Sequence, residues 1–71
     1  MKFKNEDRAT ITATNTPLDG RKVVVVGVYP TMGCDFYLIE SLDPTELFHY
    51  ADAYWKTMIL TEHCLSPIQI V

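Results

Sequence analysis

The stretch that decides the fold is Lys22-Val23-Val24-Val25-Val26-Gly27-Val28-Tyr29. Its four consecutive valines favour a strand over a helix, because a side chain branched at Cβ loses rotamer freedom against the preceding helical turn. No polar residue alternates with the valines, so we expect this strand to be central or strongly curved. Gly27 is the natural position for a bend or bulge. A straight central strand that merely tolerates this glycine is the alternative.

Four further short runs have the composition of strands, and turn residues separate them. Residues 8–14 alternate Ala and Ile with Thr, a period of two that is typical of a strand with one buried face. Residues 36–40 and 55–60 are rich in aromatic and β-branched side chains. Residues 68–71 follow Pro67, which restricts that run to a sheet edge or to a start just after the proline. The sequence therefore predicts one mostly-β domain, residues 1–71, with five strands.

Between the third and fourth runs the pattern changes from strand to helix. Asp43-Pro44-Thr45-Glu46 places Asp at an N-cap, Pro at the first helical position and Glu at the third, which is a capping box joined to a proline. Apolar side chains then recur at helical spacing from Leu47 to Tyr54. We predict a helix from Pro44 to about Tyr54, with an ordered loop as the alternative. Residues 61–64 should form a 3-10 turn, after which Leu65 enters the core.

Several segments spread along the chain share the spacing of a known class of fold. They are Phe3, Asp7–Ile11, Gly20, Val23–Val26, Tyr37–Ile39 and Leu60–Ile68. Their order resembles the SH3-like small barrels, including the KOW and Tudor types. The resemblance implies a five-stranded barrel, and the helix predicted between strands 3 and 4 is an insertion that departs from the family pattern. The resemblance also implies an adaptor that binds peptides, proteins or nucleic acid through aromatic residues in its loops.

Composition and charge narrow the class of protein. Residues 23–55 carry five acidic side chains and no Lys or Arg, whereas residues 1–22 carry five basic and three acidic ones. A central acidic region would repel a phosphate backbone, which disfavours nucleic acid as the ligand. The longest apolar run is far shorter than the ~20 residues that cross a membrane. The charged start of the chain is unlike a signal peptide. We therefore expect a cytoplasmic protein with reduced thiols and no membrane contact.

No motif in the sequence carries a reaction. Cys34, His49, His63 and Cys64 lack the pairwise spacing of a zinc site. His63 and Cys64 are adjacent, and no third group is positioned to orient a nucleophile. A chain of this length also has little room for a substrate pocket. We predict a binding module that is not an enzyme and has neither metal nor cofactor. A disulfide between the two cysteines remains an alternative to free thiols.

The best functional signal is a cluster of aromatic residues beside acidic ones. In the predicted helix, Leu47, Tyr50 and Tyr54 would face the barrel, leaving Phe48 partly outside. Trp55 is either a core plug or an interface anchor, because Trp suits both roles. The leading hypothesis is a protein–protein interaction module whose partner is not identified. Its predicted binding residues are Glu46, Phe48, Tyr50, Asp52 and Trp55.

Short chains of this kind resemble products of phages or other mobile elements, in which such a protein would bind or inhibit a host factor. Two alternatives remain open. One is a homo-oligomer assembled through open sheet edges. The other is a nucleic-acid-binding barrel that uses the basic N-terminal region, and it requires five side chains to converge on one face. These are Lys2, Lys4, Arg8, Arg21 and Lys22.

Overall fold

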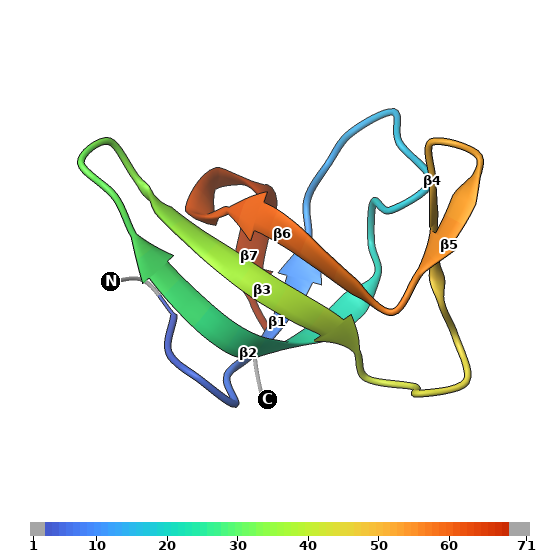
Figure 1. The fold of residues 1–71 in the computed structure, drawn as a ribbon, viewed down its shortest axis with the longest axis horizontal. Coiled ribbons are helices and arrows are strands. Elements are labelled where there is room, and N and C mark those ends of the chain that lie inside the picture. Colours follow the sequence, from blue (N-terminus) through green and yellow to red (C-terminus); the bar gives the residue numbers. More distant parts are fainter. Residues whose placement is uncertain (1–2, 69–71) are drawn as a thin grey trace.

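The computed structural model describes residues 3–68, which form seven strands and one 3-10 turn (Figure 1). Within this range no helix is present, and so none is long and apolar enough to cross a membrane. The elements are β1 (Arg8–Ile11), β2 (Lys22–Pro30), β3 (Asp35–Ser41), β4 (Phe48–Tyr50), β5 (Ala53–Trp55), β6 (Thr57–Thr61), η1 (Glu62–Cys64) and β7 (Leu65–Pro67).

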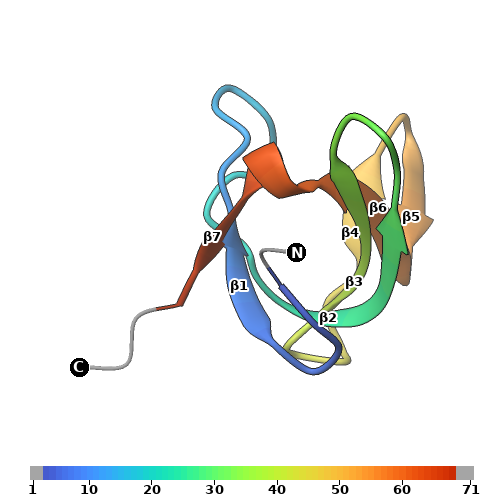
Figure 2. The same ribbon diagram turned by 90° about the vertical axis from the view of Figure 1, so that its left-hand side faces the viewer.

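Five of the strands form one antiparallel sheet in the order β6-β3-β2-β1-β7, and β4 and β5 form a separate hairpin. Figure 2 shows that β2 curves between two walls, with β1 and β7 on one side and β3 and β6 on the other. Within residues 3–68 the edge strands β6 and β7 are joined through η1 but do not pair with each other. The predicted mostly-β architecture is confirmed, whereas the closed barrel is wrong because the sheet keeps two edges.

The valine-rich strand β2 is central and bulged. Val25 pairs with Ile39 and Gly27 pairs with Leu38, so Val26 is an extra residue on β2. A Cβ on Gly27 would lie 3.2 Å from the ring of Tyr29 and 3.3 Å from Cβ of Leu38. Such separations are closer than ordinary packing allows, so glycine lets the Tyr29 ring fold back over the bulge. The predicted bulge at Gly27 is confirmed.

The core lies on the concave side of the curved sheet. Phe3 packs edge-on against Tyr37, with ring centroids 5.4 Å apart, and its N–H donates to the Tyr37 hydroxyl. Leu65, directly after η1, is buried as predicted. The alternation expected for β1 is also confirmed, since Ala9 and Ile11 are buried. The other buried apolar side chains are Leu18, Val23, Val25, Ile39 and Phe48.

The predicted helix is wrong, because residues 44–54 form a turn and most of a hairpin instead. Asp-Pro at the start is equally suited to the first two positions of a β-turn, and here the N–H of Glu46 donates to the carbonyl of Asp43. The residues that follow are aromatic and pair across β4 and β5. Backbone pairing of β4 with β5 takes the place of the helical hydrogen bonds, and aromatic cross-strand contacts and the burial of Phe48 stabilise the hairpin.

The bounds of three predicted strands differ from the observed ones by more than one residue at an end. The first ends at Ile11 rather than residue 14, and the fourth run is divided by a bend at Lys56 into β5 and β6. The last strand, β7, precedes the predicted run: it ends at Pro67, which has no N–H to continue the ladder. Ile68 is not in a strand, and residues 69–71 of the predicted run lie outside the described residues.

Candidate functional site: an aromatic hairpin

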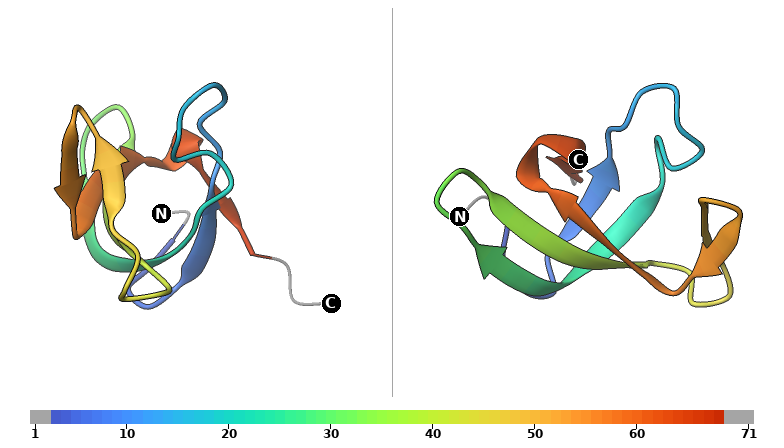
Figure 3. Two further views of the ribbon diagram at one scale, coloured as in Figure 1. Left: turned by 90° about the vertical axis from the view of Figure 1, so that its right-hand side faces the viewer. Right: turned by 45° about the horizontal axis from the view of Figure 1, so that its top comes forward.

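The β4–β5 hairpin projects from the end of the sheet that lies opposite the β2–β3 loop (Figures 1 and 3). Phe48 pairs with Trp55, His49 with Tyr54 and Tyr50 with Ala53. The two turn residues between the strands, Ala51 and Asp52, have φ angles of 53° and 60°. Positive φ at both central positions is the geometry of a type I′ turn, whose twist matches that of the strands.

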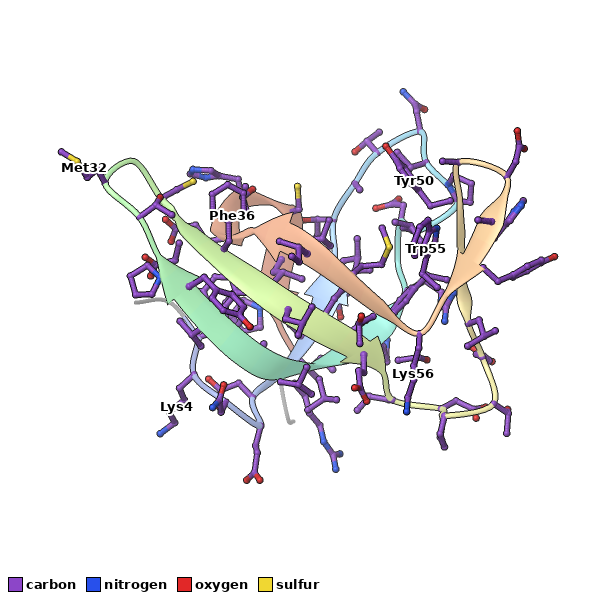
Figure 4. All side chains as sticks on the ribbon, viewed as in Figure 1. Lys4, Met32, Phe36, Tyr50, Trp55 and Lys56 are labelled. Atoms are coloured by element: carbon purple, nitrogen blue, oxygen red, sulfur yellow. The ribbon has the colours of Figure 1, made fainter. Side chains whose placement is uncertain are left out.

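The hairpin exposes aromatic side chains on both of its faces. The indole N–H of Trp55 donates to the carbonyl of Tyr50 over 2.9 Å, and on the other face His49 stacks on Tyr54 with ring centroids 4.9 Å apart. Tyr50, Tyr54 and Trp55 are 52%, 70% and 46% exposed. Figure 4 shows Tyr50 and Trp55 close together, at the far end of the molecule from Met32 and Phe36. These exposed rings bury little apolar surface in the core, so they are available to a second molecule.

Two residues attach the hairpin to the sheet. Phe48 is completely buried, and the guanidinium carbon of Arg21 lies 4.9 Å from the centroid of its ring. Arg21 also donates to the carbonyl of Leu47 over 3.4 Å and to Oγ of Ser41 over 3.2 Å. Its guanidinium lies 3.5 Å from a carboxylate oxygen of Glu46. This single cation therefore connects β3, the β3–β4 loop and the core of the hairpin.

An acidic loop leads into the hairpin. Asp43 Oδ1 accepts hydrogen bonds from the N–H of Thr45 over 3.0 Å and from its hydroxyl over 2.7 Å. These bonds hold the pKa of Asp43 below its usual value, because they favour the charged carboxylate. Asp43, Glu46 and Asp52 are all exposed, and residues 42–55 contain no Lys or Arg. The loop and the hairpin thus contribute only acidic charges, while Arg21 pairs with Glu46 and Lys56 lies beside Leu47 and Glu46.

The structure separates the predicted partner-binding residues into two groups. Tyr50, Asp52 and Trp55 are exposed on the hairpin, and Glu46 is exposed in the loop beside it, where it pairs with Arg21. Phe48 was expected to lie partly outside, and that expectation is wrong: it belongs to strand β4 rather than to a helix, and its ring is completely buried against Arg21 and the core.

Because the segment is a hairpin rather than a helix, the side chains that were expected to pack on the barrel do not do so. Leu47, Tyr50 and Tyr54 are exposed rather than buried. The prediction therefore missed Tyr54, and it also missed His49, which stacks on it. A signal for both existed in the sequence. Residues 48–50 and 53–55 are rich in aromatic side chains, which favour strands over a helix.

The predicted basic set does not form one cluster. Arg8 and Lys22 are exposed on the convex face, where they alternate with buried Ala9 and Val23. Arg21 is engaged at the hairpin, and Lys4 is exposed in the segment before β1. Lys2 lies outside the described residues.

Other chemistry-bearing residues are dispersed across the described part of the chain. Cys34 and Cys64 are both half-buried free thiols, and residues 3–68 contain no group of three His, Cys, Asp or Glu able to hold a metal. A hollow of about 450 Å³ beside the N-terminal segment contradicts the expectation of little pocket room. None of the described residues that line it is a nucleophile or a histidine. They are Phe3, Glu6, Asp7, Arg8, Leu42, Pro67 and Ile68.

Comparison with known proteins gives no relative: no protein-family model, curated protein or solved structure matches this chain. The exposed aromatic hairpin is therefore interpreted from its own geometry.

Proposed function

We propose that this chain is a non-catalytic protein-binding module that uses the β4–β5 hairpin to hold a partner surface rich in Lys or Arg. The observation that carries the proposal is the exposure of Tyr50, Tyr54 and Trp55 on a hairpin outside the main sheet. Tyr and Trp bring a large contact area at low entropic cost and are enriched among residues that dominate binding energy. None of these three rings belongs to the buried core.

Charge and attachment support the same surface. The aromatic faces attract cations, and the carboxylates of Asp43 and Asp52 add a negative potential beside them. The hairpin is held in place by buried Phe48 and by Arg21, so its exposed rings are positioned before a partner arrives. A preorganised surface loses less entropy on binding. The SH3-like resemblance agrees with a binding role, and a phage or mobile-element protein that occupies a host factor would need only such a surface.

The test compares three immobilised proteins exposed to lysate from the source cell. They are the unaltered chain, a Tyr50→Ser/Tyr54→Ser variant, and a Tyr29→Ser control. Tyr29 is 51% exposed, almost the same as Tyr50, but lies in β2. We expect the unaltered chain and the control to retain the same partner and the hairpin variant to lose it, with at least a tenfold weaker Kd for the purified partner by calorimetry.

Two further observations decide the outcome. Binding should weaken as salt is raised, because the proposed contact includes exposed charges. Circular dichroism should be the same for all three proteins, since all three altered tyrosines are exposed. Equal retention by the hairpin variant and the unaltered chain would refute the hairpin as the binding surface. A partner that carries acidic rather than basic residues at the contact would refute the proposed partner chemistry.

A further inference from the structure

The two edges of the five-stranded sheet are protected very differently. β7 is three residues long and ends in Pro67, a residue that blunts an edge because it has no N–H to offer. β6 is the other edge, and its sequence, Thr57-Met58-Ile59-Leu60-Thr61, contains no charge, proline or glycine. Natural sheets usually guard an open edge with one of these devices. An unguarded edge indicates a strand that pairs with something.

The hydrogen-bond pattern of the sheet shows which groups β6 presents at this edge. The N–H of Leu42 donates to the carbonyl of Lys22, so Glu40, two residues earlier, also directs its backbone groups at β2. Because antiparallel strands alternate, Ile39 and Tyr37 direct theirs at β6, where they pair with Met58 and Leu60. The N–H and C=O groups of Thr57 and Ile59 and the N–H of Thr61 therefore point away from β3. The C=O of Thr61, which is the N-cap of η1, belongs to the first hydrogen bond of that turn.

The side chains of β6 continue an apolar surface up to this edge. Met58 and Leu60 pack against the core, so Ile59 lies on the convex face and is 58% exposed. Its cross-strand neighbour Leu38 lies on that face too, flanked by Phe36, which is 36% exposed. An exposed apolar edge with aligned backbone donors and acceptors offers both parts of a strand–strand contact.

We propose that β6 pairs antiparallel with β6 of a second copy of this chain, about a two-fold axis at Ile59. The flanking charges identify the occupant. With Ile59 opposite its own copy, Thr57 faces Thr61 of the other chain. Lys56 and Glu62, the residues next to the two ends of the strand, are then brought close to each other once on each side of the axis. Neither Lys56 nor Glu62 has an ion-pair partner within residues 3–68. The edge is therefore complementary to itself in hydrogen bonds, apolar contact and charge, as a two-fold interface must be.

This dimer is independent of the proposed function, because it uses β6 and the convex face rather than the rings of the β4–β5 hairpin. It would join two sheets into one and leave two aromatic hairpins exposed. Two hairpins on one particle would bind a repeated partner with increased avidity. The β7 edge could instead pair with β6 of another copy, but such a head-to-tail contact continues into rings or filaments rather than stopping at a dimer.

Sedimentation equilibrium of the unaltered chain over a wide concentration range tests the proposal first. We expect a reversible monomer–dimer equilibrium and no larger species. Lys56→Glu and Glu62→Lys should each weaken dimerisation at least about tenfold, because each places like charges opposite one another twice. The double variant Lys56→Glu/Glu62→Lys should restore the affinity, since it re-creates both pairs. Tyr50→Ser/Tyr54→Ser should leave dimerisation unchanged.

Cross-linking then tests the register. In a Cys34→Ser/Cys64→Ser background, Ile59→Cys places two thiols opposite each other at the axis. Directly opposed Cα atoms in a hydrogen-bonded antiparallel pair are about 5.5 Å apart, which suits a disulfide. We expect oxidation to give a covalent dimer for this variant but not for the control Lys22→Cys, whose side chain is exposed away from the edge. A chain that stays monomeric, forms larger oligomers, or is not restored by the charge swap overturns the proposal.

Discussion

The five-stranded sheet and the β4–β5 hairpin are built from similar residues but are stabilised in different ways. Strands of the sheet supply seven of the ten buried apolar side chains, and Phe3 and Leu18, from the segments beside the sheet, belong to the same core. In the hairpin only Phe48 is buried, and Tyr50, Tyr54 and Trp55 face solvent. A two-stranded hairpin alone is marginal in water, so it depends on its attachment to a larger core. Aromatic content by itself therefore does not distinguish a core from a surface.

Replacing Phe48, the ring that attaches the hairpin to the core, should change the stability of the chain most. Phe48→Ala removes a completely buried ring and leaves the Arg21 guanidinium without its aromatic partner. We expect it to lower the free energy of unfolding by about 3–5 kcal/mol, against a total of roughly 4–10 kcal/mol for a chain of this size. Urea unfolding followed by circular dichroism measures this loss.

Tyr54→Ala is the matched control on the same hairpin. Tyr54 is 70% exposed and its ring stacks on His49 at the surface, so its replacement should cost about 0.5 kcal/mol or less. If both variants lost the same stability, the distinction between one attaching ring and several exposed rings would be wrong. For this reason a binding test that combined Phe48→Ala with Trp55→Ala would confuse loss of folding with loss of a contact.

Local patterns in the sequence predicted the sheet well. Alternation in residues 8–11, the valine run with Gly27, and the 3-10 turn before Leu65 each reflect a preference that acts over a few residues. The sheet order and the absence of closure depend on pairing between segments far apart in the chain, which no local pattern specifies. The helix prediction was wrong because Asp43-Pro44 starts a turn as readily as a helix, and only burial of Phe48 selects between them.

The candidate site was predicted in part for a related reason. Tyr50, Asp52 and Trp55 were selected as binding residues, and they are exposed on the hairpin. The hairpin itself was missed because its turn lacks the usual signal. Type I′ turns favour Asn-Gly or Asp-Gly, and the chain has Ala51-Asp52 at these positions. No other local feature of the sequence indicated that the backbone reverses here.

That turn gives the second prediction. Ala rarely adopts positive φ, because its Cβ approaches the following carbonyl, at a cost of roughly 1–2 kcal/mol. Ala51→Asn combined with Asp52→Gly relieves this strain, so we expect a gain of about 1 kcal/mol. For a chain of this size that gain raises Tm by about 4–8 °C in a thermal scan.

The converse change is available at another position. Asn15 has a φ of 67°, and Asn15→Ala should lower Tm by a similar amount. A fall in Tm for the double variant Ala51→Asn/Asp52→Gly would show that the hairpin turn is not strained. The hairpin turn would then be no more strained than the turns beside the sheet.

The smallest expected effect concerns the loop that joins the two regions. Hydrogen bonds from Thr45 lower the pKa of Asp43 below 3.8, so the unfolded chain takes up this proton more readily than the folded one. The contribution of the Asp43 turn to stability is therefore complete above that pH and is lost as the pH falls through the lowered folded pKa.

An NMR titration of the Thr45 amide should show a midpoint below 3.8. Thr45→Val removes the hydroxyl donor and should move the Asp43 midpoint, followed at its own carboxyl carbon, back toward that value. A Thr45 amide that titrates at or above it would mean that the loop does not hold this turn, and that the hairpin relies on Phe48 and Arg21 alone.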